Sequence, residues 1–378
     1  MKNTINMTGE PEIGSIISFG DYLSVLKEIR KFHCPNYDHH EIIKSFESEF
    51  SKRVGARYAL YVNSCATGID MVLKYLSLKA SDEVLCCAIN FHGTHLSIIN
   101  SGAKLVLVEA NQDLNIDISD LKNKLSSNTK AIVVTHMNGL SCGMRAIRDL
   151  VKGTDIKIVE DAARALGGKY HNEEVGKDSW ACIYSFQYKK IMTTLGEGGM
   201  IVTNDQSLYS ALNNYRSFGM GNGWGSNYKM TSVQAAMGLS QLKRLDTLIM
   251  KRRKIARSRT KYIREKLHDF VYPTDDNVFY NAYYLYTILV PEGWSKSLRD
   301  KLILSLSKKG INCVIANPPT YLKNSFIATN CDISNLPKSE RIGERIICLP
   351  IHPAMTNKEK KYISQQFIDT VYSLQNGD

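Results

Sequence analysis

An acid, a hydroxyl and an amine follow two short apolar runs of this chain. Asp161 directly follows a run that ends at Glu160, Ser185 ends the second run, and Lys190 lies five residues further on, ahead of the glycine-rich turn Gly196–Gly199. Pyridoxal phosphate (PLP) requires a lysine that forms a Schiff base, an acid that keeps its ring nitrogen protonated and donors for its phosphate. The order and spacing of these side chains therefore indicate a PLP site beyond the carboxyl ends of strands.

The segments around these residues follow an α/β pattern. Between residues 57 and 205, short β-branched runs alternate with helical patterns, which predicts a mostly parallel sheet flanked by helices. We expect seven strands, at residues 58–62, 83–87, 104–109, 131–135, 157–160, 181–185 and 200–203. Apolar spacing predicts helices at residues 66–78, 117–125 and 144–152, and one long helical stretch from residue 231 to about residue 267.

The pattern changes after Pro273 to strand, helix and strand, at residues 284–290, 297–309 and 345–349, followed by a last helix. This order predicts a smaller α+β domain. We therefore expect a large domain over residues 1–250, with the packing of residues 1–45 left open, and a small domain over residues 251–378. A chain of 378 residues is long enough to form two hydrophobic cores.

The formal charge of +11 admits nucleic acid, an anionic membrane surface or a phosphorylated small molecule as a partner. Much of the excess lies between Lys251 and Lys261, in a helical pattern without the interleaved aromatic residues of a single-strand-binding surface. We therefore expect a solvated helix face and no nucleic acid partner. No run approaches the roughly 20 apolar residues of a membrane span, so we expect a cytoplasmic protein without membrane contact.

Cysteine and histidine spacing gives no sign of a metal centre. The nine cysteines are scattered through apolar runs without a CxxC pair, which favours reduced core residues. His39 and His40 are adjacent but lack a matching ligand cluster, so we expect a surface role for them and no metal site.

Three segments together resemble the DegT/DnrJ/EryC1/StrS family, namely residues 159–163 (VEDAA), 185–190 (SFQYKK) and 196–199 (GEGG). The similarity continues through residues 101–103, 136–139, 175–176, 201–205, 227–231 and 234–242, and covers roughly residues 45 to 355. Members of this family are PLP-dependent enzymes of fold type I, chiefly aminotransferases that act on keto sugars. The resemblance therefore implies this fold, this cofactor and this activity.

The resemblance also implies a role for each matching residue. Lys190 is the Schiff-base lysine, Asp161 is the partner of the ring nitrogen, and Ser185 binds the phosphate. The family's spacing, five residues after the serine and six before the first glycine, selects Lys190 over Lys189. Phe91 matches the aromatic residue that stacks on the cofactor ring, although a core aromatic residue would give the same pattern.

Residues 62–68 link a predicted strand to a predicted helix, whose first N–H groups form an anion site. We expect the cofactor phosphate at this point, with contacts from Ser64, Cys65 and Ala66. Ser64 can also act as an N-cap, and the family's phosphate-binding threonine aligns with Ala66, one place before Thr67. In the family Asn227 comes from the neighbouring subunit, which implies a homodimer with composite sites.

Three departures from the family pattern bear on the substrate. Arg164 stands where the family usually has glutamine or histidine. Its guanidinium either lies near the cofactor's phenolate oxygen, where it would lower the Schiff-base pKa, or holds a carboxylate or phosphate of the substrate. Ala316 and Asn317 replace a common His-Tyr pair, and the first forty residues also differ from the family.

We therefore expect an aminotransferase that moves an amino group from glutamate or glutamine to a keto sugar. A nucleotide-linked sugar would suit the basic charge, because its diphosphate binds arginine and lysine. A cyclitol ketone is the nearest alternative substrate. Sugar dehydration is disfavoured because the dehydrating branch of the family has histidine in place of Lys190, and a non-catalytic partner protein is the remaining alternative.

Overall fold

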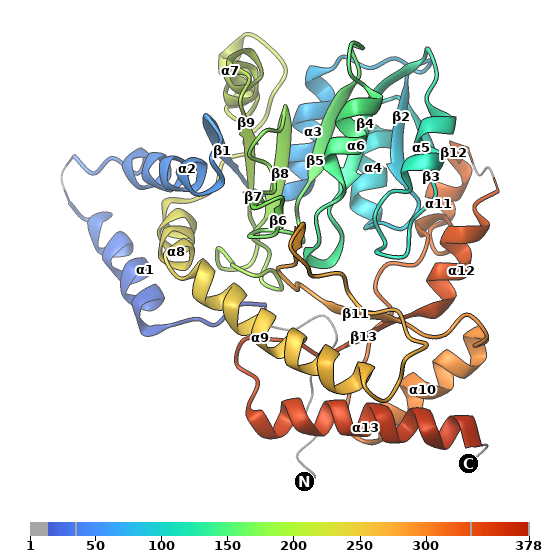
Figure 1. Cartoon of the computed structure of the whole chain (residues 1–378). Coiled ribbons are helices and arrows are strands. Elements are labelled where there is room, and N and C mark those ends of the chain that lie inside the picture. Colours follow the sequence, from blue (N-terminus) through green and yellow to red (C-terminus); the bar gives the residue numbers. More distant parts are fainter. Residues whose placement is uncertain (1–13, 35, 333–334, 377–378) are drawn as a thin grey trace.

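The computed structural model describes residues 14–34, 36–332 and 335–376 (Figure 1). An eight-stranded sheet has the order β1-β9-β8-β5-β4-β2-β3-β12. Its strands are β1 (Tyr58–Val62), β2 (Glu83–Cys87), β3 (Lys104–Val108), β4 (Thr129–Thr135), β5 (Lys157–Asp161), β8 (Ala181–Ser185), β9 (Gly199–Thr203) and β12 (Cys331–Asp332). The seven predicted strands are all present, and the two-residue strand β12 extends the sheet beyond the prediction. β9 is antiparallel to both neighbours, and the other five pairings are parallel.

Helices cover both faces of this sheet, because successive side chains of each strand point to opposite faces. In β2, Leu85 and Cys87 join one core and Val84 and Cys86 join the other. The first core also takes residues from α2 (His40–Val54), α5 (Ile118–Lys124), α6 (Met144–Leu150) and α8 (Ser232–Leu242). The second takes residues from α3 (Cys65–Tyr75), α4 (His92–Asn100), α7 (Gln206–Tyr215) and α11 (Ser325–Thr329).

The C-terminal part contributes most of a third hydrophobic core. The C-terminal part of the chain contains the antiparallel pair β11 (Tyr286–Leu289) and β13 (Ile346–Leu349), with α10 (Lys296–Lys308), α12 (Pro337–Arg345) and α13 (Asn357–Asn376). A three-stranded sheet is formed by β10 (Phe279–Tyr280), β6 (Lys169–Tyr170) and β7 (Glu173–Glu174). Short 3-10 helices are η1 (Met137–Gly139), η2 (Phe218–Gly221) and η3 (Thr320–Leu322).

The single long helix predicted from residue 231 is wrong, because the chain forms two helices there. α8 ends at Leu242 and α9 (Leu245–Arg264) follows, with non-helical backbone at Arg244 (φ −110°, ψ 1°). Arg244 donates to the carbonyl of Ile16 at 2.8 Å and forms an ion pair with Asp21, so a tertiary contact accompanies the break. The expected domain boundary at 250/251 falls inside α9, and the division into two domains stays a prediction.

Of the N-terminal segment whose packing the sequence left open, residues 14–34 and 36–45 are described and pack on the helical layer of the large sheet, while residues 1–13 and 35 lie outside the described residues. α1 (Phe19–Lys31) lies against α8 (Figure 1). Asp21 is buried in this contact and accepts hydrogen bonds from Ser240 at 2.6 Å and Gln241 at 2.8 Å. None of the helices described here has both the length and the apolarity that a membrane crossing requires.

Close backbone contact joins β9 to the start of α3. Gly199 begins β9 and pairs with Val62 on one side and Ser185 on the other. A Cβ atom at Gly199 would lie 2.6 Å from the carbonyl carbon of Ser64 and 2.8 Å from the amide nitrogen of Cys65. Glycine is therefore required here because of the packing between a strand and the turn into a helix.

Replacement of Gly199 by alanine tests this contact. Because the Cβ atom would meet backbone atoms, we expect Gly199→Ala to lower the free energy of unfolding by about 1–3 kcal/mol in urea denaturation followed by circular dichroism. Gly293→Ala is the matched control, since a Cβ atom there meets nothing within 4 Å. Equal unfolding free energies for the two variants would contradict the packing argument.

Candidate active site

A cavity of 340 Å³ opens beyond the carboxyl ends of β4, β5 and β8. Eight of the nine predicted site residues line it: Ser64, Cys65, Ala66, Phe91, Asp161, Arg164, Ser185 and Lys190. The side chain of Asn227 is exposed and does not line this cavity. The structure thus brings together the residues that the sequence assigns to a single protomer.

Asp161 is the last residue of β5 and is 3% exposed. Its Oδ2 accepts a hydrogen bond from the hydroxyl of Thr94 at 2.8 Å, and its Oδ1 accepts one from the amide of Ala163 at 3.0 Å. These two donors fix the carboxylate plane toward the cavity. Thr94 lies on α4. The sequence does not predict its role beside Asp161, because a threonine within a helix gives no functional signal.

The start of α3 presents backbone N–H groups to the cavity. Ser64 is the N-cap, and its Oγ accepts from the amide of Thr67 at 3.1 Å, which confirms the predicted capping role. The N–H groups of Cys65 and Ala66 belong to the first helical turn, which offers them no intrahelical acceptor. Burial, together with the charge of Asp161, raises the pKa of the Cys65 thiol, so this thiol is neutral at pH 7.

The loop that carries Lys190 is held on both sides by backbone hydrogen bonds. The amide of Lys190 donates to the carbonyl of Gln187 at 2.8 Å, and the amide of Tyr188 donates to the carbonyl of Gly196 at 2.9 Å. Gly14 of the N-terminal segment donates its amide to the carbonyl of Tyr188 at 3.2 Å. The loop therefore has a fixed backbone, and the glycine-rich turn and the N-terminal segment both support it.

Lys190 and Lys189 both line the cavity, but their side chains contact different rings. The Nζ atom of Lys190 lies 5.0 Å from the ring centroid of Tyr284, which is 1% exposed. The Nζ atom of Lys189 lies 5.7 Å from the ring centroid of Tyr188, which is 45% exposed. Lys190 is thus the lysine that packs against the buried ring, and its role as the Schiff-base lysine stays a prediction.

Tyr284 was predicted only as the start of a strand, yet it forms part of the cavity wall. The fully buried guanidinium of Arg252 donates to the carbonyls of Tyr283 at 3.1 Å and Tyr284 at 3.2 Å, and to Gly14 at 2.6 Å. Burial lowers the pKa of Arg252 to about 10, which leaves it charged at neutral pH. Arg252 thereby joins the N-terminal segment to the backbone of Tyr284.

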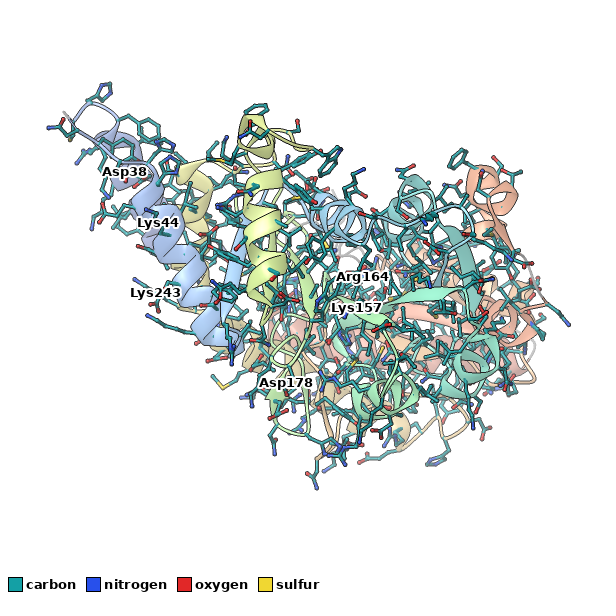
Figure 2. All side chains as sticks on the ribbon, turned by 90° about the horizontal axis from the view of Figure 1, so that it is seen from above. Asp38, Lys44, Lys157, Arg164, Asp178 and Lys243 are labelled. Carbon is teal, nitrogen blue, oxygen red and sulfur yellow. The ribbon has the colours of Figure 1, made fainter. Side chains whose placement is uncertain are left out.

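Arg164 lies in the interior of the molecule and is 6% exposed (Figure 2). Its Nη1 donates to Oδ1 of Asn138 at 2.9 Å, and its Nη2 donates to Oδ1 of Asn317 at 3.2 Å. Its Cζ lies 5.4 Å from the ring centroid of Tyr284, the ring that Lys190 also contacts. Arg164 and Asn317, which both depart from the family pattern, are therefore in contact.

The structure decides between the two alternatives for Phe91, but it does not test the role predicted for Asn227. Phe91 is 47% exposed and lines the cavity, so the alternative of a core aromatic residue is wrong. Asn227 lies in the loop before α8, where it forms a β-bridge with Ser217. Its assignment to the site of a neighbouring subunit stays a prediction.

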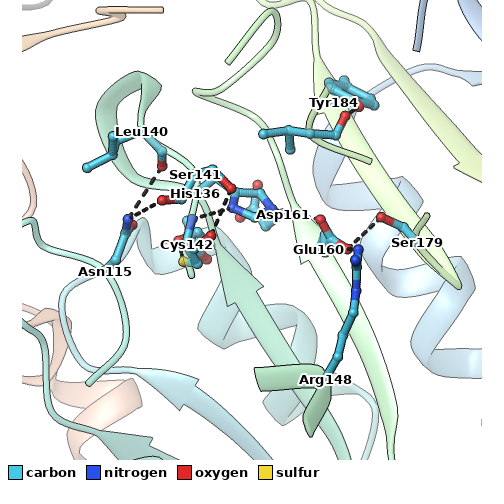
Figure 3. Close-up of polar contacts among 12 residues, drawn as sticks. Asn115, His136, Leu140, Ser141, Cys142, Arg148, Glu160, Asp161, Ser179 and Tyr184 are labelled. Atoms are coloured by element: carbon cyan, nitrogen blue, oxygen red, sulfur yellow. Dashed lines mark hydrogen bonds and ion pairs between the residues drawn. The ribbon is translucent and has the colours of Figure 1, made fainter. Parts of the chain in front are cut away.

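A second buried carboxylate lies behind Asp161 on the same strand (Figure 3). Glu160 is 1% exposed and is 2.9 Å from Nε2 of His136. The amide of Cys142 donates to Nδ1 of His136 at 3.0 Å, so the ring proton lies on Nε2 and points to Glu160. Burial alone would raise the pKa of Glu160, but hydrogen bonds from His136 and Ser179 outweigh burial and lower it.

One surface cluster within the described part of the chain has donor atoms close enough together for a metal ion. It consists of Asp38, His39 and His40, which are all exposed. Asp38 lies at the tip of the molecule, far from Arg164 (Figure 2). None of these three residues lines the cavity, and exposed acidic groups are common without a metal ion.

The lowered pKa of Glu160 leads to a prediction with a defined pH dependence. Because the ionised Glu160 accepts buried hydrogen bonds, we expect Glu160→Gln to lower the unfolding free energy by about 2 kcal/mol at neutral pH. A group whose pKa is lowered on folding stabilises the protein above its ordinary pKa of 4.5 and loses this effect below it. Urea denaturation should therefore show that the difference in unfolding free energy between wild type and Glu160→Gln is constant from pH 8 to pH 5 and shrinks below pH 4.5. A difference that already disappears near pH 6.5 would instead point to titration of an imidazole.

Comparison with known proteins identifies the family. The model of the DegT/DnrJ/EryC1/StrS aminotransferase family matches residues 35–367. GDP-perosamine synthase of Escherichia coli O157:H7 is 30% identical, over 88% of this chain and 90% of that protein. Among solved structures, Helicobacter pylori PseC, an aminotransferase involved in the biosynthesis of pseudoaminic acid, is 25% identical, with a TM-score of 0.88 over 96% of this chain and 98% of that chain.

The PLP form of Spr1654 from Streptococcus pneumoniae, a putative sugar aminotransferase, shares the fold at 22% identity, with a TM-score of 0.88 over 96% of this chain and 99% of that chain. The family match spans most of the chain and includes every strand of the large sheet. The chain therefore belongs to the DegT/DnrJ/EryC1/StrS aminotransferase family.

Proposed function

We propose that this protein is a PLP-dependent aminotransferase that moves an amino group from glutamate or glutamine to a nucleotide-linked keto sugar. The observation that carries the proposal is the meeting of Lys190, Asp161 and the start of α3 in one cavity. An amine, a buried acid and a set of backbone N–H groups are the three features that PLP requires.

The residues present fit this cofactor. Asp161 is buried, and a buried carboxylate is strongly favoured by a cation beside it, such as a protonated ring nitrogen. The N–H groups of Cys65 and Ala66 and the hydroxyl of Ser185 would hold the phosphate, since all three residues line the cavity. The half-exposed ring of Phe91 would cover the cofactor ring. When bound, PLP supplies an electron sink for negative charge at the substrate carbon.

Lys190 would act twice in this site. Its amine first holds the cofactor covalently, and after the substrate displaces it, the same amine can take a proton from the substrate carbon and return one to the cofactor. The contact with the buried ring of Tyr284 places Nζ at the cavity wall. Asp161 would hold its carboxylate next to the ring nitrogen throughout, because Thr94 and the amide of Ala163 restrain it.

Two observations support a nucleotide-linked sugar as the acceptor. The relative GDP-perosamine synthase is named for such a sugar, and PseC is described as an aminotransferase involved in the biosynthesis of pseudoaminic acid. The net charge of +11 suits a substrate that carries a diphosphate.

A homodimer with composite sites is the proposed assembly. One face of α1 exposes Phe19 (76%), Tyr22 (58%) and Leu26 (54%), which lie three and four residues apart, while the opposite face packs on α8. Exposed apolar faces of this kind are typical of protein interfaces. Asn227 is exposed outside its own cavity, which suits a contribution to the site of the second subunit.

Absorption spectroscopy tests the cofactor and the reaction together. Protein incubated with PLP should show the near-visible band of a lysine-bound cofactor, and glutamate or glutamine should bleach it by conversion to the amine form. Lys190→Ala should abolish the band, because no other amine takes its place, whereas Lys189→Ala, the matched control from the same cavity, should retain it.

The amine form should then regain the band with a keto sugar or, for the alternative substrate, with a cyclitol ketone. A wild-type protein that takes up no PLP, or a band that survives Lys190→Ala and disappears in Lys189→Ala, would refute the assignment. Failure of both donors to bleach the band would leave the cofactor site intact and refute amino transfer.

Mixing two inactive variants tests the composite site. Asn227→Asp places a negative charge beside the neighbouring subunit's phosphate, so it should inactivate the protein, as should Lys190→Ala. If Asn227 acts across the interface, subunits re-associated at random from the two variants should regain about a quarter of the wild-type sites in a transamination assay. No recovery, in a mixture shown by size-exclusion chromatography to be dimeric, would place Asn227 in its own subunit's site.

A further inference from the structure

We propose that residues 14–18 position the lysine loop (residues 186–196), with Gly14 and Arg252 as the positioning residues. This inference deepens the proposed function and rests on it, because the place of the Lys190 amine matters only if that amine holds the cofactor. The contacts themselves do not depend on the cofactor. Neither Gly14 nor Arg252 lines the cavity, so both would act through the lysine loop and the cavity wall.

The N-terminal segment contacts the backbone of the lysine loop at Gly14. The amide of Gly14 donates to the carbonyl of Tyr188 at 3.2 Å. A Cβ atom at Gly14 would lie 1.9 Å from the carbonyl oxygen of Lys189 and 2.1 Å from that of Lys190. No side chain fits between two backbones that approach this closely, so glycine is required at this residue. The place of the Lys190 backbone is therefore tied to that of Gly14.

Arg252 on α9 holds Gly14 in this place. Its Nη2 donates to the carbonyl of Gly14 at 2.6 Å. Its Nη1 donates to three further backbone carbonyls, those of Tyr283, Tyr284 and Ile351. A buried cation requires such acceptors, and the N–H groups of one guanidinium can bind several carbonyls at once. Arg252 therefore fixes the N-terminal segment relative to the cavity wall.

The next two residues of the segment are held by side chains from α8 and from the break between α8 and α9. The hydroxyl of Ser15 donates to the carboxamide oxygen of Gln241, and both residues are buried. The carbonyl of Ile16 accepts from Nε2 of Gln241 at 3.3 Å and from Arg244 at 2.8 Å. Three consecutive residues are thus fixed by side chains, which makes the segment a rigid support for the lysine loop.

One buried guanidinium therefore restrains both ends of Lys190. At the backbone end, Gly14 abuts the carbonyl of Lys190. At the amine end, Nζ lies 5.0 Å from the ring centroid of Tyr284, whose carbonyl accepts from Arg252 at 3.2 Å. An amine that bonds to the cofactor and then exchanges protons with the substrate needs this restraint, since a misplacement of about 1 Å can lower a rate ~100-fold.

The other parts of the cofactor site are held by different contacts. Thr94 donates a hydrogen bond to Asp161. Gly199 packs against the turn into α3. A disturbance of residues 14–18 should therefore displace the amine while the acid and the phosphate-binding turn keep their places. General destabilisation of the protein would affect all three.

Binding of two forms of the cofactor, measured by titration, provides the test. PLP bonds to a lysine, whereas pyridoxamine phosphate has an amine in place of the aldehyde and depends only on the other contacts. We expect Gly14→Ala and Arg252→Met to weaken PLP binding ~10-fold and to leave the affinity for pyridoxamine phosphate unchanged. Gly14→Ala removes no side-chain donor, which keeps the test available if Arg252→Met does not fold.

Hydrogen exchange of the cofactor-free protein measures the lysine loop directly. The amides of Tyr188 and Lys190 donate to carbonyls within this loop, at 2.9 and 2.8 Å. We expect both amides to exchange ~10-fold faster in Gly14→Ala and Arg252→Met, because the loop then opens at a lower cost in free energy. Gly20→Ala is the matched control from the same segment, since a Cβ atom there meets only Oγ of Ser18, at 3.6 Å.

Three results would overturn the proposal. These are unchanged PLP affinity in both variants, equal weakening of PLP and pyridoxamine phosphate, and unchanged exchange of the lysine loop. A wild-type protein that takes up no PLP would instead refute the proposed function, and the exchange measurement would still test the contacts of Gly14 and Arg252. The two failures are therefore distinguishable.

Discussion

Two consecutive carboxylates, Glu160 and Asp161, are buried at the centre of the sheet, and both accept hydrogen bonds from the surrounding residues. Successive strand residues point to opposite faces, so the two charges cannot share partners. Buried charges are stable only when they are paired or hydrogen-bonded. His136 and Ser179 donate hydrogen bonds to Glu160 on one side of the strand. Thr94 and the amide of Ala163 donate hydrogen bonds to Asp161 on the cavity side. The strand end is thereby held rigidly where chemistry requires a fixed acid.

The cavity wall depends on a second set of contacts that joins distant parts of the chain. Arg252 on α9 binds the carbonyl groups of Gly14 and Tyr284, and the ring of Tyr284 faces both Lys190 and Arg164. The N-terminal segment, the C-terminal part and the lysine loop thus meet at one tyrosine. A shift of any one of them would change the position of the amine, so the proposed reaction depends on contacts far from Asp161 in the sequence.

The strands and the residues at their ends could be predicted because the responsible signals are local. β-branched runs define the strands, and Asp161, Ser185 and Lys190 follow them at short spacing. Thr94, Asn138, Asn317 and Tyr284 were not predicted as site residues, because their roles arise from partners that are distant in the chain. The break between α8 and α9 was missed for the same reason, since the contact between Arg244 and Asp21 spans more than two hundred residues. The coupling of Arg164 with Asn317 likewise appears only in three dimensions.

Peptide mass spectrometry after borohydride reduction shows directly whether Lys190 carries the cofactor. Reduction converts the bond between PLP and a lysine into a stable amine, so proteolysis leaves the label on a single peptide. We expect a phosphopyridoxyl group on Lys190 and none on Lys189. A label on Lys189, a label spread over surface lysines, or no label at all would contradict it.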